Sequence, residues 1–369
     1  MEWNWQRSDW PDFRWDSARI SAAEGQFLLG AGVVIGSVKH MSRDERQALV
    51  VELMSREAVT TSRIEGEILN RDSVQSSIQK ELGLAVDRRR ATAAELGIAA
   101  MMVDLYRSFA EPLTEDRLFA WHRMVTSGRT DLADVGRYRT GTKPMQVVSG
   151  RIGAQRVHFE APPAASVPAE MSRFLAWFNR TMTGGSAPLP AITRAGVAHL
   201  YFESIHPFED GNGRIGRAIA EKAIAQSAGQ PILLALATAI LAHQKSYYEA
   251  LERANKRNEL TEWLTWFGDI ALQAQRQSNL QVEFLIAKTK LLDRLRGQIN
   301  ERQQKALLRM FKEGPEGFVG GLSAGNYSRI TGASPATTTR DLVDLVEKAA
   351  LTRSGERKQA RYWLNLPTA

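Results

Sequence analysis

Cysteine is absent from the 369 residues, which excludes disulfide bonds, thiol catalysis and zinc sites with cysteine ligands. Long apolar runs are missing too. The most apolar early stretch, residues 27–38, is too short to span a bilayer and contains three glycines. The first 19 residues are rich in tryptophan and charge, unlike a signal peptide. Together these absences predict a cytoplasmic protein without a membrane partner.

The composition is typical of a globular chain, with 43% hydrophobic and 24% charged residues, and the length favours two or three domains. The net charge of +7 is concentrated at one end. From Lys290 onward there are 14 Lys and Arg against 8 Asp and Glu, a local charge of +6. A basic C-terminal module favours a polyanionic partner, and a merely solvated basic surface is the alternative.

Apolar residues recur at helical spacing through most of the chain, which predicts a mainly α fold. We expect helices in residues 42–69, 91–109, 197–204, 213–223, 247–274 and 281–300. Residues 145–159 are the exception, because two β-prone runs flank a glycine-containing turn and predict a hairpin. Residues 161–168, APPAASVP, predict an extended connector.

The most informative segment is residues 205–217, IHPFEDGNGRIGR. Pro207 disfavours helix in the residue before it, so a helix is expected to end near His206. The second helix begins at about Gly213 and carries Arg214 and Arg217 on one face. Between the helices lies a turn of residues that tolerate positive φ: Asp210, Gly211, Asn212 and Gly213.

This arrangement suits a polyphosphate. The N–H groups of the turn and of the helix N-terminus form an anion-binding nest, and the two arginines add fixed positive charge. Asp210 is a hard oxygen ligand for a magnesium ion that bridges phosphates. His206 is placed to accept a proton from a hydroxyl, and Phe208 is expected to anchor the loop. The residues alone leave open an ordinary turn, or a metal site half formed by His206 and Asp210.

The segment matches the signature of the Fic family, H-P-F-x-[DE]-G-N-G-R-x-x-R, at every specified position, and so resembles a Fic active-site loop. The resemblance implies an all-α core and the transfer of AMP from ATP to Ser, Thr or Tyr of a target protein. It makes His206 the general base and Asp210 the magnesium ligand. It assigns the α- and β-phosphates to Asn212, Gly213 and Arg214, and the γ-phosphate to Arg217. The donor stays open, because relatives with this motif also use other nucleotides and diphosphate compounds.

Residues 61–66, TSRIEG, resemble the family's autoinhibitory motif, [ST]-x-x-x-E-[GN]. Thr61 and Glu65 are four residues apart and share a helix face. The resemblance implies that Glu65 pairs with Arg217 and displaces the γ-phosphate, with Gly66 ending the motif. An ordinary surface glutamate is the alternative.

Other segments resemble the borders of the Fic nucleotide site. The hairpin resembles the family's flap, which would align the target by strand addition, and Gly136–Arg139 resembles the segment before it. The flap residues expected to border the nucleotide are Val148, Ser149, Gly150 and Arg151. Tyr247, Tyr248 and Asn255 resemble the segment that borders the adenine. A purely structural hairpin and ordinary helix packing are the alternatives.

The C-terminal residues resemble a winged helix, with helices in residues 302–312 and 322–330 and a third capped by Ser334. The third helix would present Thr337, Thr338, Thr339 and Arg340 to a DNA groove, and Arg353, Arg357, Lys358 and Arg361 would meet phosphates. Protein binding is the alternative to DNA binding. A homodimer through the Trp-rich N-terminus is also left open.

These expectations divide the chain into three domains: an N-terminal helical domain with the inhibitory helix, 1–88, a Fic core, 89–297, and a winged-helix-like domain, 298–369. The predicted function is protein adenylyltransferase. A transcriptional regulator, whose Fic core senses nucleotide or modifies itself, is the alternative.

Overall fold

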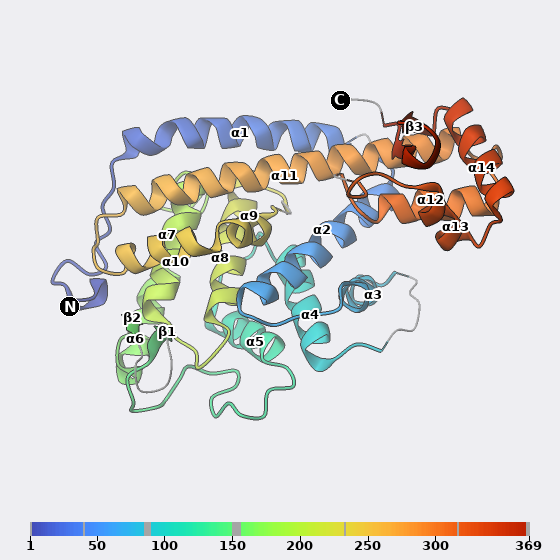
Figure 1. Ribbon diagram of the computed structural model, residues 1–369. Helices are drawn as coiled ribbons and strands as arrows, with labels where there is room; N and C mark the ends of the chain where they lie inside the picture. The colour runs from blue at the N-terminus through green and yellow to red at the C-terminus, as the bar shows by residue number, and fades with distance from the viewer. Residues whose placement is uncertain are drawn as a thin grey trace. The chain divides into compact units, whose positions relative to one another are not determined.

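The computed structural model describes residues 2–39, 41–84, 90–149, 156–231, 234–315 and 317–366. The fold is mainly helical with small β-hairpins, as predicted (Figure 1). The chain divides into two compact units: residues 1–33 with 50–278, and residues 34–49 with 279–369. No helix in the described ranges is both long and apolar enough to cross a membrane. The predicted division into three domains stays a prediction.

The helices and strands of the first unit are α1 (Ser17–Lys39), α2 (Arg43–Ile64), α3 (Arg71–Glu81), α4 (Ala93–Arg107), α5 (Glu115–Val125), β1 (Gln146–Ser149), β2 (Arg156–Glu160), α6 (Val167–Arg180), α7 (Ala191–Ile205), α8 (Asn212–Ala228), α9 (Leu236–Ala242), α10 (Gln244–Ala254) and α11 (Thr261–Arg294). Helices α1, α2 and α11 extend into the second unit. Strands β1 and β2 pair antiparallel, which confirms the predicted hairpin.

The helices α7 and α8 form the centre of the first unit (Figure 1). Every residue of α7 is buried, which suits a helix that is apolar on most sides. Gly196 allows a close approach to α11, because a Cβ there would collide with Leu264. The indole of Trp263 donates to the carbonyl of Gly196 at 2.8 Å. The loop between α7 and α8 is therefore held at both ends by rigid, buried helices.

The N-terminal segment is part of this core. Asn4 is fully buried, donating its side-chain amide to the hydroxyl of Ser204 at 2.8 Å and its backbone N–H to the carbonyl of Asn255 at 2.7 Å. Trp10 packs edge-to-face on Tyr201 of α7. Asn4 and Trp10 therefore join the N-terminal segment to α7.

One predicted helix, residues 247–274, is wrong, because α10 ends at Ala254 and α11 begins at Thr261. The break pairs with the N-terminal segment: the N–H of Leu260 donates to the carbonyl of Arg14 at 2.7 Å, and that of Arg14 donates to the carbonyl of Asn258 at 2.9 Å. These distant contacts override the local helical pattern. The predicted connector is also shorter than expected, since α6 begins at Val167 with Pro168 in its first turn.

The second unit contains α12 (Glu301–Phe311), α13 (Ala324–Thr331), α14 (Pro335–Glu347), β3 (Leu351–Ser354) and β4 (Arg361–Leu364). This order of three helices and a hairpin is the one expected from the sequence. Ser334 caps α14 as predicted, accepting from the N–H of Thr337 at 3.3 Å. Thr338, however, is buried, so the expectation that it faces a DNA groove is wrong.

Candidate functional site

The loop between α7 and α8, residues 206–211, is shaped by two left-handed residues. His206 ends α7 with φ 49° and Gly211 precedes α8 with φ 83°. A residue with a Cβ is strained in this left-handed conformation, whereas glycine adopts it freely. The side chain of Asn212 closes the loop, accepting from the N–H of Phe208 at 3.0 Å and donating to its carbonyl at 2.8 Å. That side chain is therefore used within the loop, although its residue was expected to hold phosphates.

Two residues that sequence reasoning did not assign to the site hold the loop from outside. Arg139 donates its side chain to the carbonyl of His206 at 2.8 Å and its backbone N–H to the carbonyl of Pro207 at 2.9 Å. His122 of α5 lies 3.1 Å from the carbonyl of Asp210 and stacks on Phe208 with 4.2 Å between ring centroids. The run Gly136–Arg139 signalled the arginine, whereas nothing in the motif signalled the histidine.

The imidazole of His122 is held in one tautomer. Its Nδ1 accepts from the N–H of Gly136 at 2.9 Å, so Nε2 carries the proton and donates to Asp210. Burial lowers the pKa of His122 to about 4, so this neutral form persists at pH 7.

His206 is held in a form that can accept a proton. Burial, assisted by the charge of Arg139, lowers the pKa of His206 to about 4. Its Nδ1 is 3.7 Å from Oε2 of Glu203, a buried residue one turn earlier on α7. Burial raises the pKa of Glu203 to about 8, so this carboxyl is mainly protonated at neutral pH. The imidazole is therefore neutral at pH 7 and has a ring nitrogen that can accept a proton.

The two arginines of α8 are buried and each is paired with a carboxylate. Arg217 donates Nη2 to Oε1 of Glu65 at 2.7 Å, and its Nε to the hydroxyl of Thr61 at 2.7 Å. Arg214 donates Nη1 to Oε2 of Glu67 at 3.0 Å. The structure thus brings together the predicted partners Thr61, Glu65 and Arg217, and adds a pair that was not predicted.

The Glu65 carboxylate lies over the first turn of α8, since a Cβ at Gly213 would collide with its Oε1. Buried nitrogens in this region, Nη1 of Arg217 and Nε of Arg214, have no hydrogen-bond partner among the described residues. Unpaired buried donors at a helix N-terminus are suited to an anionic ligand.

Gly66 shapes the end of α2 with φ 82°. Its N–H donates to the carbonyl of Arg63 at 3.0 Å, and the N–H of Glu67 donates to the carbonyl of Ser62 at 3.0 Å. These two bonds form a Schellman motif with glycine in its left-handed position. Gly66 therefore fixes the direction in which the chain, with Glu65 and Glu67, passes α8.

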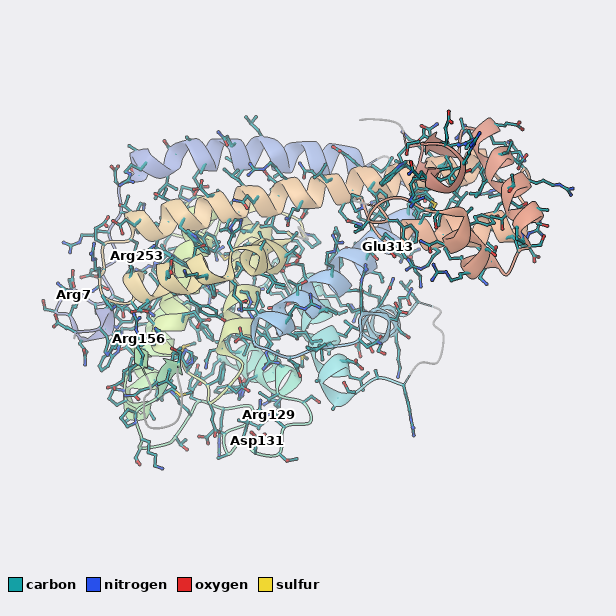
Figure 2. All side chains as sticks on the ribbon, in the orientation of Figure 1. Arg7, Arg129, Asp131, Arg156, Arg253 and Glu313 are labelled. Atoms are coloured by element: carbon teal, nitrogen blue, oxygen red, sulfur yellow. The ribbon has the colours of Figure 1, made fainter. Side chains whose placement is uncertain are left out.

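Asp210 lies at the edge of the same turn. Its Oδ1 accepts from the N–H of Gly211 at 2.6 Å, and its Oδ2 forms an ion pair with Arg129. Figure 2 shows Arg129 and Asp131 in the loop after α5, where the guanidinium also makes two 2.7 Å hydrogen bonds to Asp131. In the part of the chain that the structure describes, no three His, Asp or Glu residues cluster as a metal site. A single carboxylate fits magnesium, which takes its other ligands from phosphates and water.

Some of the residues predicted to border the nucleotide are exposed, and others are buried. Val148 is partly exposed on β1, and Ser149 Oγ is 2.6 Å from Nε2 of His158 across the hairpin. Tyr248 is exposed, with its hydroxyl 3.4 Å from the carbonyl of Ile64 at the end of α2. Gly150 and Arg151 lie outside the described residues.

Tyr247 and Asn255, by contrast, are buried and hydrogen-bonded to other core residues. The hydroxyl of Tyr247 is 2.8 Å from Nε2 of His199. Oδ1 of Asn255 accepts from the hydroxyl of Ser204 at 3.1 Å, beside Asn4. In the described contacts, both side chains stabilise the core around α7.

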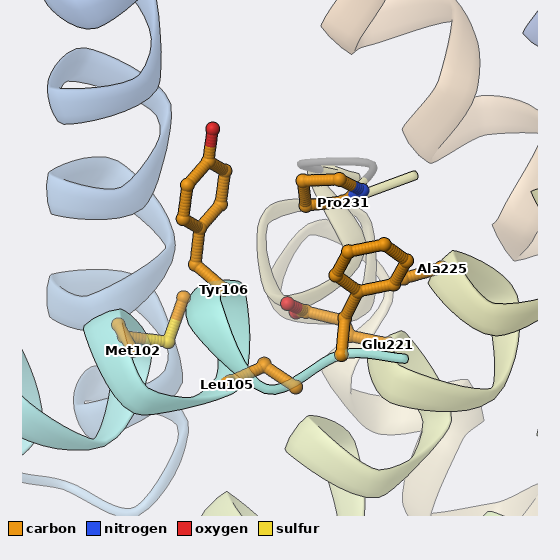
Figure 3. A pocket seen from close by; sticks show the side chains of 7 residues that line it. Met102, Leu105, Tyr106, Glu221, Ala225 and Pro231 are labelled. Carbon is orange, nitrogen blue, oxygen red and sulfur yellow. The ribbon is translucent and has the colours of Figure 1, made fainter. Parts of the chain in front are cut away.

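Two further hollows in the described part of the chain differ greatly in size. The cavity in Figure 3, lined by Met102, Tyr106, Glu221 and their neighbours, has a volume of about 10 Å³, which leaves no room for a nucleotide. A larger groove of about 690 Å³ lies beside the hairpin, and its lining includes Trp5, Tyr138, Met145, Ala161 and Pro163.

Comparisons with known proteins find similar families and relatives. Residues 112–224 match the Fic/DOC family, and residues 3–84 match a domain of unknown function, DUF4172. The chain is 29% identical over 145 residues to the protein adenylyltransferase fic-1 of Caenorhabditis elegans, covering 39% of this chain and 25% of that protein. It is 25% identical over 199 residues to the protein adenylyltransferase Fic of Culex quinquefasciatus, covering 52% of this chain and 35% of that protein. The matches thus span about a quarter to a third of these relatives.

Solved structures share the fold. A Fic family protein from Desulfovibrio desulfuricans G20 has a TM-score of 0.53 at 22% identity, covering 93% of this chain and 95% of that chain. Fic-1 (residues 134–508) from C. elegans has a TM-score of 0.51 at 21% identity, covering 71% of this chain and 74% of that chain.

Proposed function

We propose that the chain is a Fic-type transferase that moves AMP from ATP to a Ser, Thr or Tyr hydroxyl of a target protein. Its match to the Fic/DOC family over residues 112–224 and its distant similarity to protein adenylyltransferases support the proposal. One observation carries the proposal: a neutral His206 comes just before α8, and two buried arginines lie in the first two turns of that helix. A proton acceptor and a polyphosphate site are the two parts that nucleotidyl transfer requires.

In the proposed reaction, the target hydroxyl oxygen attacks the α-phosphorus of ATP. The new O–P bond forms, the bond from the α-phosphorus to the bridging oxygen breaks, and pyrophosphate leaves. His206 takes the hydroxyl proton, for which its lowered pKa keeps it available. Arg214 holds the α- and β-phosphates and Arg217 the γ-phosphate. Asp210 would hold magnesium, which supplies charge neutralisation between the phosphates.

The flap would present the target. Strands β1 and β2 offer an exposed edge for strand addition. The hairpin is tied to α10 through Glu252, which lies 2.8 Å from both Arg156 and Nδ1 of His158. The groove of about 690 Å³ beside it gives a side chain of the target room to dock.

Glu65 would restrain the reaction. Its carboxylate occupies the side of Arg217 that a γ-phosphate would need, and negative charge there repels the donor. A protein in this state binds ATP poorly until Glu65 moves or is removed.

Intact mass spectrometry tests the proposal. Purified Glu65→Gly protein is incubated with ATP and magnesium beside the unchanged protein and the Glu65→Gly/His206→Ala variant. We expect AMP adducts on the Glu65→Gly protein alone. Adducts that persist without His206 would contradict its role as base, and adducts on none of the samples, even with added candidate targets, would contradict the transferase. Repeating the reaction with UTP and GTP tests the donor.

A second function, DNA binding by the C-terminal unit, is favoured by its order of elements and by exposed basic residues. Arg340 is exposed on α14, and Arg353 and Arg357 are exposed on the β3–β4 hairpin. Loss of sequence-specific binding in the Arg340→Ala protein at physiological salt would support it. Sequence-blind, salt-sensitive binding would contradict it.

A further inference from the structure

The segment after α2 carries a second acidic residue that reaches the donor site. Glu67 Oε2 is 3.0 Å from Nη1 of Arg214, whereas Glu65 Oε1 is 2.7 Å from Nη2 of Arg217. Two carboxylates, two positions apart, therefore pair with both arginines in the first two turns of α8. The Glu67 side chain is 35% exposed, so it can leave Arg214 without unfolding its surroundings.

The guanidinium of Arg214 is held in place by groups other than Glu67. Nη1 also donates to the carbonyl of Val125 at 3.1 Å, and Nη2 is 3.7 Å from Oδ1 of Asp210. Arg214 therefore stays oriented when Glu67 departs. Its Nε, unpaired among the described residues, is available to a phosphate oxygen.

We propose that Glu67 is a second competitor of the donor and sets which nucleotides bind. This inference rests on the proposed function, which assigns the α- and β-phosphates to Arg214 and the γ-phosphate to Arg217. Glu65 competes with a phosphate that only triphosphates carry. Glu67 competes with phosphates that ADP and ATP share. The two carboxylates therefore restrain the same site with different nucleotide selectivity.

The two roles predict different binding patterns. Removing the charge of Glu67 raises the affinity for ADP and for ATP by the same factor, about three- to tenfold for one charge-assisted contact. Removing the charge of Glu65 raises the affinity for ATP and leaves the affinity for ADP nearly unchanged. Shortening Glu67 to aspartate keeps the charge and weakens the contact, so it gives a smaller gain.

Calorimetric titration with ATP, ADP and inorganic tripolyphosphate measures these patterns, with His206→Ala in every protein to prevent turnover. Glu65→Gln, Glu67→Gln and Glu67→Asp are compared with Asp269→Asn, which removes an exposed carboxylate from α11 and controls for net charge. Equal gains for ADP and ATP in Glu67→Gln are expected. Unchanged ADP affinity in that variant, or an equal gain in Asp269→Asn, would overturn the inference.

The mass-spectrometric assay separates this inference from the proposed function. Transfer of AMP by Glu65→Gly with no change of ADP affinity in Glu67→Gln overturns the role of Glu67 alone. The expected binding pattern without any AMP transfer overturns the transferase and supports the role of Glu67. Failure of every variant to bind ATP, ADP or tripolyphosphate overturns both.

Discussion

Replacing Glu65 by glutamine is expected to destabilise the protein and to make its stability depend on phosphate ligands. Arg217 is 2% exposed at its side chain, and its contacts are with Glu65 at 2.7 Å and with the hydroxyl and carbonyl of Thr61 at 2.7 and 3.0 Å. Glutamine keeps the shape of the side chain and one acceptor oxygen. It removes the negative charge, so the buried guanidinium loses its counter-ion.

The size of the effect follows from the burial of each partner. Breaking a fully buried ion pair costs about 3–5 kcal/mol. The Glu65 side chain is 31% exposed, and water reaching it screens part of that energy. The cost is therefore about 1–3 kcal/mol, which lowers Tm by about 2–10 °C in a domain of this size.

A bound polyphosphate should reverse the loss. It supplies the missing negative charge in the variant, whereas in the unchanged protein Glu65 already supplies it. A ligand at one hundred times its Kd adds about 2.7 kcal/mol, which matches the predicted cost. Differential scanning fluorimetry of both proteins, with and without ATP and magnesium, measures how far Tm falls in the variant and how far the ligand restores it.

The reasoning would be refuted by a Glu65→Gln protein with unchanged Tm, since Arg217 would then not depend on that charge. Equal stabilisation of both proteins by ATP would refute the competition. Asp269→Asn serves as the control for a lost surface charge.

Three further results are expected. Gly66→Ala places a Cβ at φ 82°, which costs about 1–2 kcal/mol and changes the direction of the chain at Glu67. Tm therefore falls and ADP binds more tightly. Unchanged ADP affinity would contradict the role of the Schellman motif in positioning Glu67. Arg129→Gln removes the cation paired with Asp210, so the magnesium concentration for half-maximal AMP transfer by the Glu65→Gly protein falls by about two- to fivefold. An unchanged magnesium concentration would show that Arg129 does not compete with magnesium for Asp210. Burial, assisted by Glu57, raises the pKa of Glu221 well above its ordinary 4.5, so the folded state binds an extra proton and stability falls as pH rises above that value. Glu221→Gln should flatten this slope in thermal unfolding between pH 5 and 8, and an unaltered slope would assign it to other groups.

The sequence predicted the helix–turn–helix arrangement around residues 206–211 because its constraints are local. Pro207 and the glycines around Asn212 dictate where one helix ends and the next begins, and the spacing of Arg214 and Arg217 puts both on one face. The structure has this arrangement, with α7 ending at Ile205 and α8 starting at Asn212. The pairing of Glu65 with Arg217 came from resemblance, and the geometry agrees with it.

The residues missed by sequence reasoning are those whose role depends on distant packing. His122 is 88 residues from the carbonyl it supports, and no local pattern distinguishes it from an ordinary core histidine. The break between α10 and α11 depends on pairing with residues near Arg14, about 245 positions away in sequence. Asn255 resembled a ligand contact, yet its described partners are Ser204 and Asn4.

The charge balance in the first two turns of α8 connects the proposed inhibition with folding. Arg214 and Arg217 add two buried positive charges to a helix N-terminus that already carries a positive partial charge. Without anions this concentration of charge is costly, because burial removes the solvation of each guanidinium. Glu65 and Glu67 supply two carboxylates from one segment, and in the proposed function the same carboxylates compete with the donor. In the proposal a triphosphate donor replaces both charges, and the more deeply buried Arg217 is the arginine whose loss of a counter-ion would weaken the fold.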